Sequence, residues 1–128
     1  MDREKLLDLY KKYELGKTDV YKHQHYVIIT RQGIERIAAK ENIAINYEVV
    51  KCEPSFAVVK AYAKKEEVQI ETFGSALKGA NYKDGNCNSW YVMEMAEKRA
   101  LSRSVLKLTG FYELGVFGED ESDDFKRK

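Results

Sequence analysis

The longest run of this chain without glycine or proline contains most of the segment from Ser89 to Gly110, SWYVMEMAEKRALSRSVLKLTG. It is rich in strong helix formers, Asn88 or Ser89 can cap its beginning, and Gly110 can end it. We therefore predict a long helix over these residues. At 100° per residue, one broad face is apolar, with small residues in its middle: Met93, Ala96, Ala100, Leu101, Ser104, Val105 and Leu108. Such a face predicts close packing against a sheet.

A row of cations lies to one side of that face. Arg99, Arg103 and Lys107 are spaced four residues apart, which places them in line along the helix. Two interpretations are open. The row is either an exposed ridge at the rim that can contact a polyanion, or a solvated edge whose long side chains cover part of the core. Glu94 and Glu97 lie on the opposite flank of the helix.

Three strands are expected before the long helix, at residues 45–51, 56–64 and 68–73. Their side chains alternate with a period of two, and the links between them are short, which implies an antiparallel meander. The middle strand carries two different faces. One face consists of Ala57, Val59, Ala61 and Ala63, and the other combines Phe56, Val58, Lys60, Tyr62 and Lys64. The second face is therefore aromatic and cationic together.

Two further helices are expected near the beginning of the chain. The first covers residues 2–14, and the second covers residues 31–42 behind a Thr30 cap. Residues 17–25 between them are polar and predict a connector. Residues 26–29 form a short apolar run that predicts an extended segment.

Residues 74–88 are rich in glycine and asparagine, so we expect a long loop that begins with a helical turn at residues 75–78. Residues 111–117 are expected to return to the core or to a sheet edge. The predicted fold is α+β: an antiparallel three-stranded sheet covered by a long C-terminal helix, with N-terminal helices. The single domain is expected to span residues 1–117, and residues 118–128 to form an acidic, disordered tail.

The charge of the chain is unevenly distributed. The formal net charge is +1, but acidic residues crowd into the segment from Glu119 to Asp124, which leaves the preceding body basic. A nearly neutral total therefore does not exclude a polyanionic partner.

The cysteine content and the apolar runs suggest a cellular location. Cys52 and Cys87 are the only cysteines, they have no CxxC spacing, and no signal peptide precedes them. No apolar run approaches the roughly 18 residues of a membrane span. We expect a cytoplasmic protein with free thiols and no membrane contact.

The familiar catalytic motifs are missing from the sequence. There is no phosphate loop, no GxGxxG and no nucleophile elbow, so we expect no catalysis, no cofactor and no metal. Two alternatives stay open. His23 and His25 could ligate zinc with help from a distant cysteine, and Glu94 and Glu97 could hold the metal ion of a nuclease. Exposed histidines and ordinary surface acids are the competing interpretations.

Cations and aromatic residues are interleaved in the second half of the chain. Phosphates favour such cations, and unpaired bases favour aromatic side chains on which they stack. An antiparallel sheet with one polar face also shows lysine and tyrosine, so the pattern alone does not separate the two explanations. The candidate nucleic-acid-binding residues are Arg99, Arg103, Lys107, Lys60, Lys64, Lys78, Lys83 and Tyr62; Lys65, Tyr82 and Trp90 belong to the same pattern.

Two stretches resemble the core of the Rad52-type single-strand annealing proteins, including short phage and archaeal relatives. One is YVIITRQGIERIAAKENIAINYEVV, an entry into the first strand, and the other is WYVMEMAEKRALSRSVLKLTGF, which contains the pattern A-E-x-R-A-x-x-R. Together with their surroundings they span about residues 21–114. The glycine-rich signature of the family between strand and helix is matched only at Phe73-Gly74-Ser75, and the chain is shorter than the better-known annealing domains.

The resemblance implies a β-β-β-α core that assembles into rings or filaments and anneals complementary strands without a nucleotide. It also implies that Arg99 and Arg103, with Lys107 and Lys60, contact the phosphates of single-stranded DNA. DNA is therefore favoured over RNA, and a homo-oligomer is expected. A domain that binds double-stranded RNA has a related α-β-β-β-α order, so the sequence leaves that alternative open.

The acidic tail suggests a different class of function. GEDESDDF resembles the acidic tail of bacterial single-strand-binding proteins, which docks partner proteins, although three basic residues follow Phe125 here. A protein partner for the segment Glu119–Phe125 is therefore possible, and a small interaction or adaptor domain is the alternative function. A tail that only increases solubility is the simpler interpretation.

Overall fold

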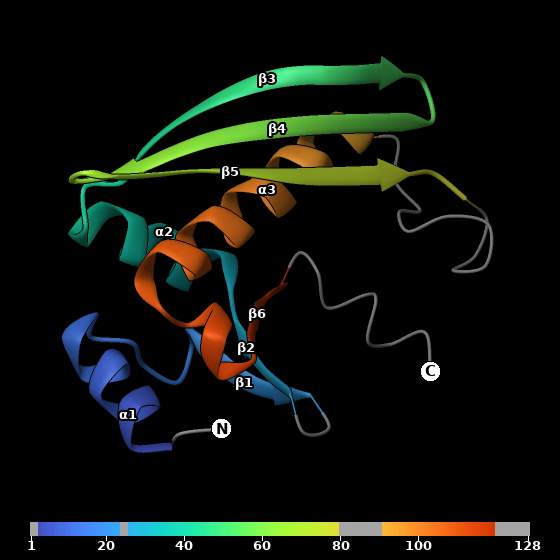
Figure 1. Ribbon diagram of the computed structural model, residues 1–128. Coiled ribbons are helices and arrows are strands. Elements are labelled where there is room, and N and C mark those ends of the chain that lie inside the picture. Colours follow the sequence, from blue (N-terminus) through green and yellow to red (C-terminus); the bar gives the residue numbers. More distant parts are fainter. Residues whose placement is uncertain (1–2, 24–25, 80–90, 120–128) are drawn as a thin grey trace.

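The computed structural model describes residues 3–23, 26–79 and 91–119, and it confirms the α+β class (Figure 1). A three-stranded antiparallel sheet packs against the long helix α3, as predicted. A second, smaller sheet and two short helices lie beyond α3. The elements in order are α1 (Arg3–Lys12), β1 (Val20–His23), β2 (Tyr26–Ile29), α2 (Arg31–Lys40), β3 (Ala44–Glu53), β4 (Phe56–Lys65), β5 (Val68–Leu77), α3 (Val92–Thr109), the 3-10 helix η1 (Tyr112–Leu114) and β6 (Val116–Gly118).

The large sheet has the order β3-β4-β5, and its middle strand shows the predicted two faces. Ala57, Val59, Ala61 and Ala63 are buried under α3. These small side chains meet Ala96 and Ala100 of the helix, so helix and sheet can approach closely. No described element covers the opposite face of this sheet, which turns outward in Figure 1.

The strand β5 is longer than expected, and the prediction of a loop and a helical turn from residue 74 onward is wrong up to Leu77. Gly74 and Ala76 continue the alternation on the α3 side. A Cβ atom added to Gly74 would fall on the carbonyl oxygen of Ala96 and 2.5 Å from the amide nitrogen of Ala100. Gly74 is therefore required by the close approach of the helix rather than by a turn.

The small sheet was not predicted. β1 occupies part of the segment expected to be a polar connector, and it pairs with β2 in an antiparallel hairpin. β6 pairs in parallel with the other side of β2, so the order is β1-β2-β6. Only Val20 and Tyr21 of β1 are apolar or aromatic, so no alternating pattern indicates a strand there.

The helix α3 joins two cores. Its first half packs on the large sheet, whereas Val105 and Leu106 in its second half join a core built from α1, α2, β2 and β6. Phe111, just after α3, is fully buried in the second core. The Asn88 and Ser89 caps proposed for α3 lie outside the described residues, and the described helix begins at Val92.

The body of the protein extends beyond the predicted boundary at residue 117. Gly118 is buried as the last residue of β6, and the Glu119 carboxylate accepts a hydrogen bond of 3.2 Å from the backbone N–H of Arg31. The rest of the predicted tail, residues 120–128, lies outside the described residues. In the described ranges no helix is both long and apolar enough to cross a bilayer.

Candidate nucleic-acid interface

The predicted ridge of Arg99, Arg103 and Lys107 is not an exposed row. Arg99 is only 4% exposed, and its guanidinium donates a hydrogen bond of 2.7 Å to the backbone carbonyl of Ser75. Arg103 is half-buried and donates one of 3.0 Å to the carbonyl of Phe73. The expectation that both arginines stand at the rim is therefore wrong for Arg99.

The two arginines instead follow the outer edge of β5. Phe73 and Ser75 are two residues apart, so their carbonyls point the same way, while Arg99 and Arg103 are one helical turn apart. Residues four apart in a helix are separated by roughly 6 Å along its axis, and residues two apart in a strand by roughly 7 Å. Each arginine can therefore face one carbonyl. The arginines thus satisfy backbone acceptors that an edge strand leaves open.

Lys107, the third member of the predicted row, is exposed. Its ammonium lies 5.3 Å from the ring centre of Tyr112, on η1. This cation–π contact leaves Lys107 on the surface, beyond the two arginines.

The uncovered face of the large sheet brings together two other predicted residues, Lys60 and Tyr62. The Lys60 ammonium lies 5.0 Å from the ring centre of Tyr62 and 5.6 Å from that of Phe73. It also forms an ion pair of 3.2 Å with Glu71. The hydrogen bond that the Lys60 ammonium donates to Glu71, followed by the one it donates to the Tyr62 oxygen, raises the pKa of Lys60, so this lysine is positively charged at neutral pH.

Acidic groups balance most of the charge on this face. The Tyr62 hydroxyl donates a hydrogen bond of 2.8 Å to Glu48, and Glu71 is already paired with Lys60. Lys64 follows on the same face of β4 and is exposed; among the described residues it has no ion-pair partner. The face is therefore an aromatic surface with one paired and one unpaired lysine.

Phe73 is the residue of this surface that sequence reasoning missed. It lies directly opposite Lys60 in the β4–β5 register and is 49% exposed. The alternation of β5 contained the signal, because Val68, Ile70 and Thr72 were assigned to the other face. Continued past Gly74, the same alternation also brings Leu77 to this face, opposite Phe56.

Another predicted cation, Lys78, lies just past the end of β5 rather than on this surface. Its backbone N–H donates a hydrogen bond of 2.7 Å to the carbonyl of Ser55. Lys83, Tyr82 and Trp90 lie outside the described residues.

The proposed metal ligands that the structure describes lie away from this sheet face. Glu94 and Glu97 line a pocket of about 310 Å³ together with two cations, Arg31 and Lys98. His23 is in β1, whereas His25 lies outside the described residues. Within residues 3–23, 26–79 and 91–119, no group of three histidine, cysteine or acidic side chains could hold a metal ion.

Comparison with known proteins identifies no relative of this chain. No protein-family model matches the chain, and neither the curated proteins nor the solved structures contain a significant match. The resemblance to the Rad52-type annealing proteins therefore stays a prediction from the sequence.

Proposed function

We propose that this protein binds single-stranded nucleic acid, with DNA favoured over RNA, and promotes strand annealing without catalysis. The observation that carries the proposal is the sheet face that no described element covers, on which Phe73 and Tyr62 flank Lys60. An exposed aromatic ring beside a cation offers both things that an unpaired strand needs: a stacking platform and a partner for phosphate.

The proposed roles differ between the residues of this face. Phe73, with about half of its surface exposed, stacks on a base. Lys64 contacts phosphate directly, because it has no ion-pair partner among the described residues. Lys60 contacts phosphate by exchanging its carboxylate partner, Glu71, for the strand. Arg99 and Arg103 then act indirectly, because their hydrogen bonds to the carbonyls of Ser75 and Phe73 hold the strand that presents the ring.

A titration of labelled single strands at two salt concentrations tests the proposal. Phe73→Ala should weaken binding about 5- to 150-fold, which corresponds to a stacking loss of roughly 1–3 kcal/mol. Lys64→Ala should reduce the slope of log K against log salt by about 0.7, the value for one phosphate contact on a single strand. Duplex DNA and single-stranded RNA of the same length serve as competitors.

Tyr47→Ala is the matched control. Tyr47 is an aromatic residue of similar exposure, but it lies opposite Ala61 in the register and therefore on the other face of the same sheet. Its replacement should leave strand affinity unchanged. If Phe73→Ala binds single strands as tightly as the unmodified protein at both salt concentrations, the sheet face is not the binding surface.

An adaptor function is the second candidate, and the edge strand β3 favours it. Nine of its ten residues are exposed, including the apolar Val49 and Val50. An open strand edge of this kind can accept a strand from a partner or from another copy of the chain. A homo-oligomer, as the annealing proposal expects, would use the same edge. Failure to bind any nucleic acid at low salt, with a partner lost on Val49→Lys, would favour the adaptor.

A further inference from the structure

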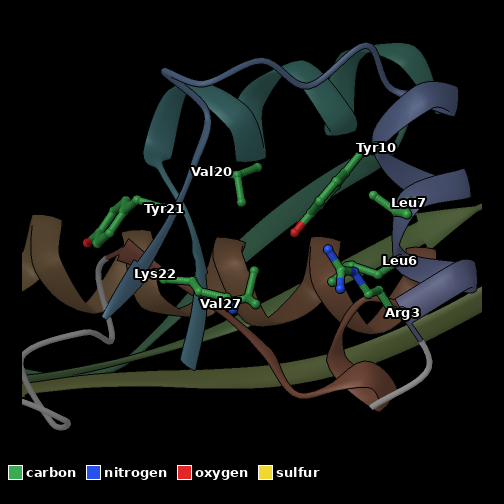
Figure 2. A pocket seen from close by; sticks show the side chains of 8 residues that line it. All are labelled: Arg3, Leu6, Leu7, Tyr10, Val20, Tyr21, Lys22 and Val27. Atoms are coloured by element: carbon green, nitrogen blue, oxygen red, sulfur yellow. The ribbon is translucent and has the colours of Figure 1, made fainter. Parts of the chain in front are cut away.

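A pocket of about 500 Å³ opens between α1 and the edge strand β1, away from the large sheet (Figure 2). Its apolar wall consists of Leu6, Leu7, Val20 and Val27. Figure 2 shows Tyr10 and Arg3 directed from α1 toward the strands, where Val20 and Val27 face them. The volume lies in the range of small-molecule and side-chain sites, about 300–1,000 Å³.

The charged residues of this pocket are all positive. Arg3 stands at the α1 side and Lys22 at the β1 side, and neither has an ion-pair partner among the described residues. Other pockets on the described surface include acids: Asp8 and Glu113 in one, Glu94 and Glu97 in another. An apolar pocket with two unpaired cations at its rim favours a ligand that joins an apolar group to several negative charges.

We propose that this pocket binds the acidic segment Asp120–Phe125 of the same chain. The segment DESDDF carries four carboxylates and one phenylalanine, which matches two cations around an apolar wall. The Phe125 ring enters the apolar pocket against Leu7 and Val27. Neighbouring carboxylates of the segment pair with Arg3 and Lys22. The inference stands apart from the proposed nucleic-acid function, because it uses neither the sheet face nor α3.

The length of the segment permits docking within one chain. Gly118 pairs with Ile29, and Ile29 pairs with Val20, so two strand spacings, about 10 Å, separate the end of β6 from the pocket strand. Two further residues along β1, about 7 Å, lead to Lys22. The six Cα–Cα steps from Glu119 to Phe125 reach about 20 Å when the segment is extended. The extended segment is therefore long enough to span both separations, from β6 to β1 and along β1 to Lys22.

Methyl NMR on the full chain tests the proposal. A docked Phe125 ring shifts the methyl resonances of Leu7 and Val27, so Phe125→Ser should move both, while Val68, an exposed valine on the large sheet, should not move. Lys22→Glu should lower the docking constant about two- to tenfold, as expected for the loss and reversal of exposed charge pairs. The matched control is Lys11→Glu, on α1 but outside the pocket lining, which should leave the shifts unchanged.

Each outcome decides the question. Pocket shifts that depend on Phe125, decrease with Lys22→Glu and stay constant on dilution support docking within the chain. Leu7 and Val27 resonances that are identical with and without Phe125 overturn the proposal. Shifts that disappear on dilution also overturn it, because the segment would then come from another molecule. If Lys22→Glu and Lys11→Glu lowered the docking constant equally, the attraction would be unspecific, and the pocket would be rejected as the docking site.

Discussion

β3 and β5 are the two edge strands of the same sheet and have the same length, yet their surroundings differ (Figure 1). α3 lies close to β5, and Arg99 and Arg103 bind the carbonyls on its outer edge. β3 lies on the other side of β4, and most of its side chains are exposed on both faces. One edge is thus closed by side chains of the protein itself, and the other is open.

This difference restricts how copies of the chain can assemble. A ring or filament made by pairing one edge with the opposite edge of the next copy needs two open edges. Here the outer carbonyls of Phe73 and Ser75 are already occupied. Pairing through β3 alone brings identical edges together and stops at a dimer. Larger assemblies, if the protein forms them, must use other surfaces as well.

The largest expected effect comes from Gly74, which lets α3 approach the closed edge. Gly74→Ala places a methyl group against the backbone of Ala96 and Ala100, which cannot move aside as a flexible side chain could. We expect the free energy of unfolding to fall by about 3 kcal/mol or more. Urea denaturation monitored by circular dichroism measures the loss.

Gly16→Ala is the control for this experiment. The nearest atom to an added Cβ at Gly16 is a side-chain oxygen of Asp19 at 4.0 Å, so the midpoint should hardly change. An unchanged midpoint for Gly74→Ala would show that β5 and α3 are not in the close contact on which the closed edge depends.

The arginines at the closed edge should rank by burial. Arg99→Ala leaves the Ser75 carbonyl without its donor and removes a buried side chain, at a cost of about 2–3 kcal/mol. Arg103→Ala should cost about 1 kcal/mol, because Arg103 is only half-buried. Lys107→Ala should be nearly neutral. Thermal and urea denaturation of the three variants gives the order. Equal small losses in the free energy of unfolding would mean that all three side chains are exposed, as the sequence predicted.

A smaller effect is expected where β3 begins. Glu41 follows α2 and accepts a hydrogen bond of 2.6 Å from the Tyr13 hydroxyl, with Lys12 at 3.1 Å and Lys65 at 3.3 Å. These partners, the Tyr13 hydrogen bond foremost, lower the pKa of Glu41 from 4.5 to about 2. The carboxylate thus links α1 and β4 at the entry of the open-edge strand.

The depressed pKa fixes the sign of the pH dependence. The contribution of Glu41 is fully present above pH 4.5, and it is lost as the pH falls toward about 2. We expect a contribution of about 1–2 kcal/mol after solvent screening. Urea midpoints between pH 2 and 6 should show this loss in the unmodified protein and not in Glu41→Gln. Glu35→Gln, in an exposed ion pair with Arg31, is the control and should keep the full dependence.

Local sequence patterns were sufficient for much of the closed region. The alternation of alanines in β4 and the long helix predicted the sheet, its antiparallel order and the face under α3. The Thr30 cap is confirmed, because its hydroxyl accepts a hydrogen bond of 3.2 Å from the Gly33 amide. These features depend on neighbours in the sequence, and a periodic pattern records them.

Features that depend on distant contacts could not be predicted in this way. β6 has only three residues and forms because β2, far away in the sequence, offers a partner. Arg99 is buried because α3 lies beside an edge strand that needs donors, and helical periodicity alone places it next to solvent. For the candidate surface, Lys60 and Tyr62 were recognised. The alternation of β5 was enough to place Phe73 beside them, whereas Leu77 required the correct length of β5.

The smallest effect on stability, and the most direct test of the open edge, comes from Val49→Lys. Val49 is 57% exposed on β3, so its replacement should change the free energy of unfolding by less than about 0.5 kcal/mol. A lysine on an edge strand opposes pairing with another strand. The self-association through β3 that the annealing proposal expects, measured by sedimentation, should therefore weaken about tenfold or more, whereas Val68→Lys, at the beginning of β5 and equally exposed, should leave it unchanged. If Val68→Lys dissociates the protein and Val49→Lys does not, the two edges have been assigned the wrong way round, because assembly would then run through the strand whose carbonyls the arginines occupy.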